Sequence, residues 1–371
     1  MSNKEAVPFN DLSRIHLPLL GEFKDELTKL VESSNLVLGQ AVSNFEDDLA
    51  IAEDCNFALG VNNGTSAIEL ALKSLDVGPG DEVITTAFTF VATCFSILQT
   101  GAKPVLVDID PLTGLLDPIG IERAITPKTK ALVFVTLHGR VELLDQLQAI
   151  CKENELHFVI DAAQSHLGKF NGKSLSTYCD VATLSFYPGK NLGALGEGGA
   201  VLTNSQEIKD KLILMRDWGA PEKYNHTTWG GNFRLESLQA AFLRIKLGGL
   251  ESWTLERQVI ARTYERELNP EILMKSVDEK GSHVNHIYSI SIRNRDEFCK
   301  LLSQNHIGFG FHYPRAIHQQ PAYRNKVLTP VALSNSELLA SKTVSIPMFP
   351  GMTDFETQRV IEVVNSAVKV M

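Results

Sequence analysis

The stretch Ser185-Phe186-Tyr187-Pro188-Gly189-Lys190-Asn191-Leu192-Gly193 begins at the end of an apolar run, Ala182 to Phe186. An earlier apolar run, Phe158 to Ile160, ends directly in the polar residue Asp161. Short β-branched runs bounded by polar and glycine-rich residues are typical of buried strands. In sheets of parallel strands, ligands bind at the carboxyl ends of the strands. Both polar stretches are therefore expected at such a binding edge.

Similar runs occur on both sides of this stretch and alternate with amphipathic segments. This alternation predicts an α/β fold in which a mostly parallel sheet is covered by helices on both faces. We expect a seven-stranded sheet. Its strands are Phe57–Val61, Glu82–Thr86, Pro104–Ile109, Ala131–Val135, Phe158–Ile160, Ala182–Phe186 and Ala200–Thr203.

The chain beyond the seventh strand has a different pattern. Apolar residues recur at helical spacing from Leu235 to Leu250 and again from Glu256 to Leu268, which predicts a helical connection out of the sheet. A strand, a helix and a strand are then expected at Ile287–Ile292, Arg295–Asn305 and Ile307–Tyr313. The sequence thus predicts a large domain over residues 1–250 and a smaller α+β domain over residues 251–371.

Composition excludes several classes of protein. The formal net charge of −9 argues against general binding to nucleic acid or anionic lipid, because both need a basic surface. The five cysteines are scattered and lack the paired spacing of a metal site, so we expect free thiols in a reducing cytoplasm and no metal. The start of the chain is polar, and no stretch approaches the roughly 20 apolar residues that span a bilayer. The sequence predicts a cytoplasmic protein without a membrane partner.

A helix start after the first strand is a candidate phosphate site. Asn63-Gly64-Thr65-Ser66 precedes an apolar helical pattern, and the unpaired N–H groups at a helix start attract phosphate. Gly64, Thr65 and Ser66 are the expected ligands, and the hydroxyl of Ser185 could reach the same phosphate. The alternative is an ordinary helix cap, since any helix start favours these residue types.

Phe90 follows the second strand, where its ring could stack on a flat cofactor. The alternative is that Phe90 is a core residue, and Phe88 on the same segment competes for the stacking role. Gln164, which follows Asp161 by one turn, could hydrogen-bond a hydroxyl of the cofactor ring.

Asp161 and Lys190 together indicate the cofactor. A carboxylate at the end of a buried strand can keep a pyridine nitrogen protonated, and a desolvated lysine can bind an aldehyde as a Schiff base. Taken alone, Asp161 is equally well explained as a helix cap, and Lys190 is better explained as a solvated loop residue. Their occurrence in one order at successive strand ends favours a pyridoxal 5'-phosphate site.

The chain resembles the DegT/DnrJ/StrS-type sugar aminotransferases, which are enzymes of fold type I, the aspartate-aminotransferase-like fold. The resemblance spans nearly the whole chain and is most specific between Ser185 and Gly199. The other stretches that carry it are Pro8–Leu12, Val37–Gly39, Gly64-Thr65, Thr89–Thr93, Asp161–Gln164, Gly231–Leu235 and His312–Pro314.

This resemblance implies roles for individual residues. Lys190 would bind the cofactor and move protons, Asp161 would contact the ring nitrogen, and Asn232 would bind the phosphate from the partner subunit. The active sites would then be shared within a homodimer. His312 and Tyr313, at the end of the last expected strand, would reach the substrate. Because Lys190 is present where some relatives have histidine and act as dehydratases, transamination is favoured.

One segment departs from the family pattern. Family members often have His-Leu-Tyr-Gly where this chain has Thr136-Leu137-His138-Gly139, followed by Arg140. Arg140 is therefore a candidate for binding a substrate anion, and a solvated arginine is the alternative.

The resemblance implies transfer of an amino group from L-glutamate to a keto sugar, most plausibly a nucleotide-linked 3- or 4-keto-6-deoxyhexose. The product would be an amino sugar for a polysaccharide or a secondary metabolite. Two alternatives stay open: a keto-cyclitol or non-nucleotide keto sugar as acceptor, and a non-catalytic regulator that binds the cofactor.

Overall fold

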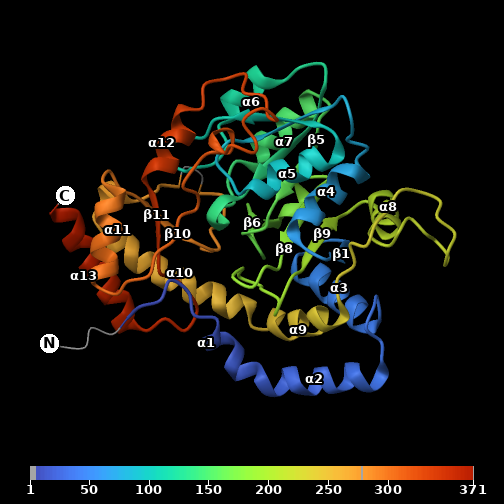
Figure 1. Ribbon diagram of the computed structural model, residues 1–371, viewed down its shortest axis with the longest axis horizontal. Coiled ribbons are helices and arrows are strands. Elements are labelled where there is room, and N and C mark those ends of the chain that lie inside the picture. The colour runs from blue at the N-terminus through green and yellow to red at the C-terminus, as the bar shows by residue number, and fades with distance from the viewer. Residues whose placement is uncertain (1–5, 277–278, 371) are drawn as a thin grey trace.

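A seven-stranded sheet forms the centre of the computed structural model, which describes residues 6–276 and 279–370 (Figure 1). The strand order is β1-β9-β8-β5-β4-β2-β3. All seven predicted strands are confirmed. They are β1 (Phe57–Val61), β2 (Glu82–Thr86), β3 (Lys103–Val107), β4 (Thr129–Val135), β5 (His157–Asp161), β8 (Val181–Ser185) and β9 (Gly199–Thr203).

Strand β9 is the antiparallel member of this sheet. It pairs antiparallel with both β1 and β8, whereas the other neighbouring strands are parallel. The pairing places Val61, at the end of β1, opposite Gly199, and Gly199 is also opposite Ser185 at the end of β8. The carboxyl ends of β1 and β8 therefore meet at the same edge.

Alternating side chains of the strands pack on opposite faces, as expected for a sheet buried on both sides. In β4, Leu132 and Phe134 belong to one core cluster, and Ala131 and Val133 belong to another. The first face is covered by α3 (Gln40–Ala52), α6 (Pro118–Ala124), α7 (Leu144–Glu153) and α9 (Ser237–Leu247). The second is covered by α4 (Gly64–Ser74), α5 (Val91–Thr100) and α8 (Gln206–Arg216).

Short elements complete the N-terminal part. Helices α1 (Ser13–His16) and α2 (Leu20–Ser33) precede the sheet, and α2 packs against α9. Strands β6 (Lys169–Phe170) and β7 (Lys173–Ser174) form a two-stranded hairpin. Single 3₁₀ turns occupy Leu17–Leu19, Leu137–Gly139, Leu175–Thr177, Pro270–Ile272 and Ile317–Gln319.

The C-terminal elements build a separate core, on the left in Figure 1. A long helix, α10 (Leu250–Glu267), leads to it, as the helical spacing predicted. An antiparallel pair, β10 (Tyr288–Ser291) and β11 (Thr343–Ile346), supplies the strands of this region. The helices are α11 (Arg295–Gln304), α12 (Ser334–Lys342) and α13 (Asp354–Lys369).

The predicted strand Ile307–Tyr313 is wrong. Only single-residue bridges form there, between Val7 and Ile307 and between Gly310 and Ser345. A Cβ added to Gly308 would lie 2.3 Å from the backbone nitrogen of Phe9. The apolar pattern of this segment therefore reflects close backbone packing at a glycine and not a continuous ladder.

The C-terminal third also packs back onto the large sheet. Ile317 and Leu333 share a small core with Ala87, Cys94 and Leu106. In the other direction, Val7 from the start of the chain lies in the C-terminal core. The division at residue 250 stays a prediction.

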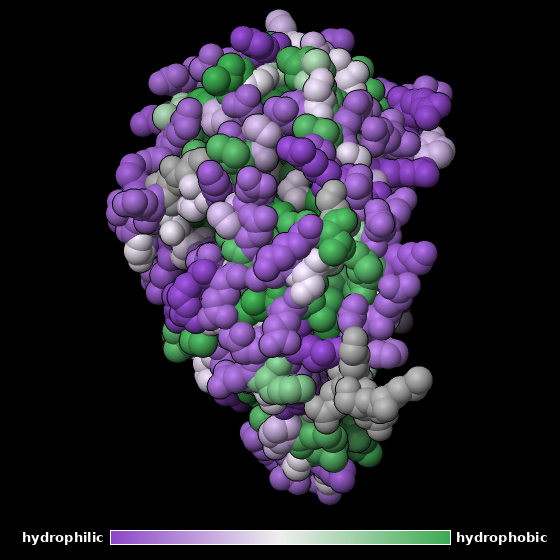
Figure 2. All heavy atoms as spheres, turned by 90° about the vertical axis from the view of Figure 1, so that its left-hand side faces the viewer, coloured by the Kyte–Doolittle hydropathy of each residue, from purple (hydrophilic) through white to green (hydrophobic). Residues whose placement is uncertain are grey.

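The surface of the C-terminal side is mixed in character. Figure 2, seen from the left of Figure 1, shows mostly hydrophilic side chains with smaller hydrophobic patches between them. Within residues 6–276 and 279–370, no helix combines the length and the apolar composition that crossing a membrane requires.

Candidate active site

A cavity of about 1080 Å³ lies where β5 and β8 end and α4 and α5 begin. Its wall also includes residues of the N-terminal segment and of the C-terminal region. Ten of the twelve predicted site residues line it. They are Gly64, Thr65, Ser66, Phe90, Asp161, Gln164, Ser185, Lys190, His312 and Tyr313.

The start of α4 forms one end of this cavity. Asn63 caps the helix, since its Oδ1 accepts a hydrogen bond from the Ser66 N–H at 2.8 Å. A Cβ added to Gly64 would lie 2.6 Å from Cβ of Ser185, so glycine is needed for the end of β8 to approach the helix this closely. The first N–H groups of a helix have no partner within the helix and carry the positive end of its dipole. This end of the cavity suits a phosphate.

Asp161 is a buried carboxylate at the end of β5. It accepts hydrogen bonds from the Thr93 hydroxyl at 2.8 Å and from the Ala163 N–H at 3.2 Å. Among the residues that the structure describes, it forms no ion pair within 4.0 Å. Burial raises the pKa of the Asp161 carboxyl, against the effect of these hydrogen bonds and of the Lys190 charge. A carboxylate in this setting is stabilised by a cationic N–H partner.

Lys190 projects from the turn that follows β8. Its backbone N–H donates to the Tyr187 carbonyl at 2.8 Å, and a Cβ added to Gly193 would lie 2.2 Å from the Pro188 oxygen. The turn therefore needs glycine at that position. Burial lowers the pKa of the Lys190 amine to about 8, while the nearby charge of Asp161 acts to raise it. Part of the amine is thus neutral near physiological pH, as nucleophilic attack requires.

Phe90, not Phe88, lines the cavity. Phe88 is completely buried in the core, whereas Phe90 is 54% exposed and its ring centroid lies 5.7 Å from that of Tyr313. Gln164 contacts the same tyrosine, because its Nε2 donates to the Tyr313 hydroxyl at 3.1 Å. Its Oε1 accepts from the His138 N–H at 2.5 Å. The expected contact of Gln164 with a ring hydroxyl of the cofactor remains a prediction.

His312 is held by a network of neutral side chains. Its Nδ1 lies 2.9 Å from the Ser345 hydroxyl, which lies 3.0 Å from that of Ser289. The His138 Nε2 lies 3.0 Å from the His312 carbonyl oxygen. Burial lowers the pKa of His312 to about 4 and that of His138 to about 3, so both rings are neutral at physiological pH. The displaced histidine of the Thr136–Arg140 segment thus supports the cavity wall.

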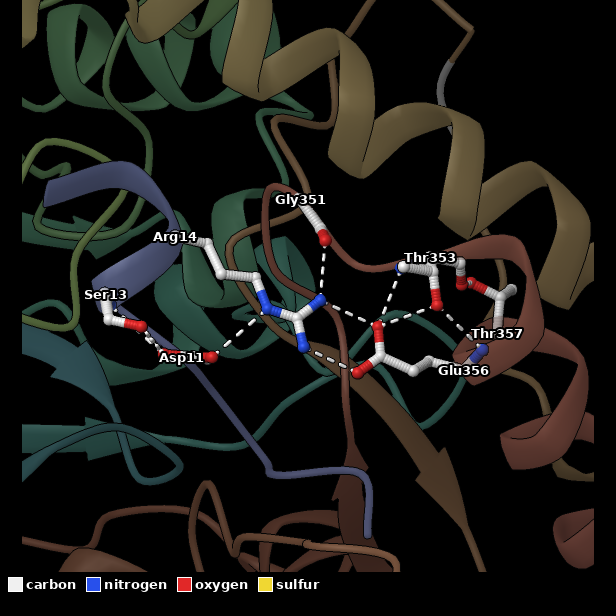
Figure 3. Close-up of polar contacts among 7 residues, drawn as sticks. All are labelled: Asp11, Ser13, Arg14, Gly351, Thr353, Glu356 and Thr357. Atoms are coloured by element: carbon white, nitrogen blue, oxygen red, sulfur yellow. Dashed lines mark hydrogen bonds and ion pairs between the residues drawn. The ribbon is translucent and has the colours of Figure 1, made fainter. Parts of the chain in front are cut away.

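The N-terminal segment closes another part of the wall. Phe9 stacks on the His312 ring, with 5.7 Å between centroids. Figure 3 shows how this segment is fixed: the Arg14 guanidinium lies between Asp11 and Glu356 of α13. Two nitrogens of Arg14 donate to the two oxygens of Glu356 at 2.6 and 2.7 Å, and a third donates to Asp11 at 3.1 Å. Hydrogen bonds from Arg14 lower the pKa of Glu356 to about 2, so this contact persists at physiological pH.

Two predicted site residues do not line the cavity. The assignment of Arg140 to a substrate anion is corrected, because its buried guanidinium donates to Glu142 at 3.1 Å and to the Lys275 carbonyl at 3.0 Å. Asn232 is exposed and forms an isolated bridge with Asp217. Its role toward a partner subunit stays a prediction.

The wall also includes residues that sequence reasoning did not select, among them Phe9, Thr93, Arg257 and His286. Thr93 follows Phe90 by three residues at a helix start, a spacing that places both on one face. His286 directly precedes the strand predicted from Ile287, and its polar side chain beside an apolar run was the available signal. Arg257 lies within a helix of mixed composition, and nothing in its spacing distinguishes it from a surface arginine.

The side chains that line the cavity fit pyridoxal phosphate. The α4 start and Ser185 offer donors to a phosphate, and Asp161 offers a buried carboxylate to a protonated ring nitrogen. Lys190 offers an amine that is partly neutral near pH 8. These residues surround one cavity, and each matches a different functional group of the cofactor.

Comparisons with known proteins agree with this fit. A model of the DegT/DnrJ/EryC1/StrS aminotransferase family matches residues 19–365. The chain is 40% identical over 361 residues to the "Pleiotropic regulatory protein" of Geobacillus stearothermophilus, covering 96% of this chain and 97% of the relative. It is 37% identical over 360 residues to the dTDP-3-amino-3,4,6-trideoxy-alpha-D-glucose transaminase of Streptomyces venezuelae, covering 96% and 95%.

Solved structures show the same architecture. The crystal structure of S. venezuelae DesV in complex with a ketimine intermediate matches with a TM-score of 0.95 and 36% identity, covering 98% of this chain and 99% of that chain. The structure of ntda from Bacillus subtilis with the bound cofactor PMP matches with a TM-score of 0.91 and 29% identity, covering 100% and 87%. The predicted α/β fold of type I pyridoxal-phosphate enzymes is confirmed.

Proposed function

The chain belongs to the DegT/DnrJ/EryC1/StrS aminotransferase family, and we propose that it transfers the amino group of L-glutamate to C3 of a nucleotide-linked 3-keto-6-deoxyhexose. It is a pyridoxal-phosphate-dependent sugar aminotransferase. The observation that carries the proposed chemistry is the presence of Lys190 and Asp161 in one cavity, with the pKa of the lysine lowered to about 8.

Two observations support the proposed acceptor. The S. venezuelae relative is named for a dTDP-linked sugar with its amino group at C3. The cavity, at about 1080 Å³, is slightly larger than the usual range of ligand pockets, roughly 300–1,000 Å³. Such a volume favours a second ligand of substantial size beside the cofactor.

Lys190 and Asp161 have different roles in the proposed reaction. Pyridoxal phosphate, when bound, withdraws electrons from the carbon that carries the reacting amine. Lys190 Nζ acts as the base that takes the proton from Cα of the donor and later returns a proton to the sugar carbon. Asp161 holds the proton of the ring nitrogen, and its orientation is fixed by Thr93 and Ala163. The exchange turns donor amine and sugar ketone into a 2-oxo acid and an amino sugar.

The first experiment is a visible absorption spectrum of the holoenzyme before and after L-glutamate, alongside Lys190→Ala. We expect glutamate to convert the band of the lysine-bound cofactor to the pyridoxamine form in the wild type alone. Subsequent addition of dTDP- or UDP-linked 3-keto sugars should restore the original band. An unchanged band with glutamate would exclude it as donor, and normal turnover by Lys190→Ala would overturn the assigned role of this lysine.

The alternatives are separated by the acceptor half-reaction. Equal turnover of a keto sugar with and without its nucleotide would favour a keto-cyclitol or a free keto sugar. A 40% identical relative is named a regulatory protein. A non-catalytic regulator would bind the cofactor, but none of the donors would transfer an amino group to it.

We also propose that two copies of the chain share their active sites. Phe90 and Tyr187 line the cavity and yet are 54% and 57% exposed, which supports a surface that a second chain covers. Asn232 is exposed and lies outside the cavity of its own chain. It belongs to the segment 218–232, here called the arm, in which Trp218 and Trp229 are also exposed. A partner that inserts this arm would bring Asn232 to the phosphate end.

Mixing two variants tests this arrangement, which predicts that each of them is inactive by itself. Lys190→Ala and Asn232→Ala are unfolded and refolded together to form mixed dimers. If sites are shared, one site of each mixed dimer combines Lys190 from one chain with Asn232 from the other, and activity returns. If each site is built from a single chain, Asn232→Ala alone stays active, because Asn232 lies outside the cavity of its own chain, and mixing adds no activity.

A further inference from the structure

Arg257 is a buried cation in the wall of the cavity. It lies on α10, it is 4% exposed, and it is the only arginine among the described lining residues. The other lining cation is Lys190, and the lining acids are Glu69, Asp161 and Glu197. A guanidinium in this position has a large desolvation cost unless an anion compensates it.

The described residues satisfy the guanidinium only in part. Nη1 donates to the carbonyls of Met348 at 2.8 Å and His286 at 3.3 Å. Nε is buried without a hydrogen-bond partner. Within residues 6–276 and 279–370, no carboxylate forms an ion pair with Arg257. Burial lowers its pKa to about 10, which leaves the group charged at physiological pH.

Hydrogen bonds tie Arg257 to the turn that carries Lys190. Asn191 donates through Nδ2 to the Val284 carbonyl at 3.1 Å, so its Oδ1 accepts from Nδ1 of His286 at 3.0 Å. The His286 carbonyl in turn accepts from Arg257. The charges of both Lys190 and Arg257 add to the effect of burial in lowering the pKa of His286. Arg257 and Lys190 therefore line one cavity and are linked through His286 and Asn191.

From these contacts we propose that Arg257 binds the α-carboxylate of the amino-group donor. The inference rests on the proposed transamination, because any α-amino-acid donor carries a carboxylate one bond from the carbon that Lys190 deprotonates. The α4 start would bind the cofactor phosphate and Lys190 would bind the cofactor aldehyde, so Arg257 is the remaining cation among the described lining residues. Its planar donor fork matches a carboxylate.

The test separates the two half-reactions of the holoenzyme. Arg257→Lys retains the charge without the fork, and Arg257→Gln removes the charge. We expect the apparent dissociation constant of L-glutamate, measured from the spectral change in single turnovers, to rise at least roughly tenfold in both variants. The unreacted cofactor band, the melting temperature of Arg257→Lys and the acceptor half-reaction should change little.

Arg295 provides a matched control. Its Nη1 also donates to a carbonyl, that of Ala340, and its Nε is also buried without a partner, but it does not line the cavity. Arg295→Lys should leave the donor half-reaction unchanged. An equal effect of Arg295→Lys and Arg257→Lys would assign both arginines a structural role and overturn the proposal.

Donors with and without the α-carboxylate give a second readout. The wild type should favour L-glutamate over 4-aminobutyrate, and the Arg257 variants should lose most of this preference. An unchanged ratio would overturn the proposal, as would a loss confined to the nucleotide-sugar half-reaction. If the wild type rejects L-glutamate, L-glutamine and L-alanine replace it, since both carry the α-carboxylate. Failure of the proposed donor is thereby distinguished from failure of the carboxylate site.

Discussion

The side-chain amide of Gln164 donates a hydrogen bond to the Tyr313 hydroxyl at 3.1 Å, although the two residues are 149 positions apart. Gln164 follows the end of β5 in the large sheet, and Tyr313 belongs to the segment that precedes α12. The same amide accepts from the His138 backbone. One side chain thus joins three segments around the cavity.

Tyr313→Phe should lower kcat/KM roughly tenfold, because the part-buried amide of Gln164 loses its hydrogen-bond acceptor. Loss of such an acceptor corresponds to about 1–2 kcal/mol of free energy. The phenyl ring retains the contact with Phe90, so cofactor affinity should stay the same. Steady-state kinetics and a cofactor titration measure the two effects. Tyr323→Phe, outside the cavity, is the control, and a similar loss in that variant would contradict the explanation.

Cofactor capture by Lys190 should depend on pH. The amine must be neutral to attack, so the rate should rise with pH and level off above about 8, the pKa to which burial lowers it. Since the charge of Asp161 raises this pKa, Asp161→Asn should move the midpoint to lower pH. The visible band that grows when cofactor-free protein meets pyridoxal phosphate gives the rate. A midpoint that rises in Asp161→Asn would refute the assigned interaction.

The cofactor-free protein should be stabilised by Lys190→Met. The folded-state pKa of about 8 is below the unfolded value of about 10.4, so the folded chain binds fewer protons between these limits. The burial penalty is therefore complete below pH 8 and disappears as pH rises toward 10.4. The variant should gain roughly 1–3 kcal/mol in the free energy of unfolding at pH 7 and less at pH 10.

Urea unfolding at both pH values measures this difference. Lys24→Met, at an exposed position, should show no comparable gain. A gain for Lys190→Met that is independent of pH would point to better packing by methionine and not to the removed charge.

Gly64→Ala should weaken cofactor binding roughly tenfold. The new Cβ would lie 2.6 Å from Cβ of Ser185, so the helix start and the strand end must separate at the phosphate site. Overpacking of this kind costs about 1–3 kcal/mol. Equilibrium titration of the cofactor-free protein measures the affinity. Gly21→Ala meets no atom within 4 Å and should bind the cofactor as the wild type does.

The sequence predicted the strands of the large sheet because each is a short apolar run buried on both faces, a strong local signal. Once the strands were predicted, their ends were also known. This placed Asp161, Ser185 and Lys190 at one edge of the sheet, where the cavity lies. The choice of Phe90 over Phe88 could not be made from spacing, since both aromatic residues suit a core. The fold decides it by burying Phe88 completely.

The failures have a common physical cause in contacts between distant segments. Arg140 does not line the cavity, and its contact with the Lys275 carbonyl, 135 positions away, cannot be foreseen from the residues around it in the sequence. Arg257 was missed because only the packing of α10 against the C-terminal core shows that this arginine faces the cavity. Ile307–Tyr313 has the composition of a strand, but close packing of Gly308 against Phe9 replaces the ladder.

The place of β9 between β1 and β8 sets an order of events during synthesis on the ribosome. Within the sheet, β1 (Phe57–Val61) pairs with β9 (Gly199–Thr203). During synthesis, β1 therefore has no strand to pair with until β9 has left the ribosome. The α4 start follows β1 directly, and a Cβ on Gly199 would lie 2.5 Å from the Asn63 carbonyl carbon. Pairing over such a separation is intrinsically slow. This end of the cavity can therefore be completed only after more than half of the chain has been translated.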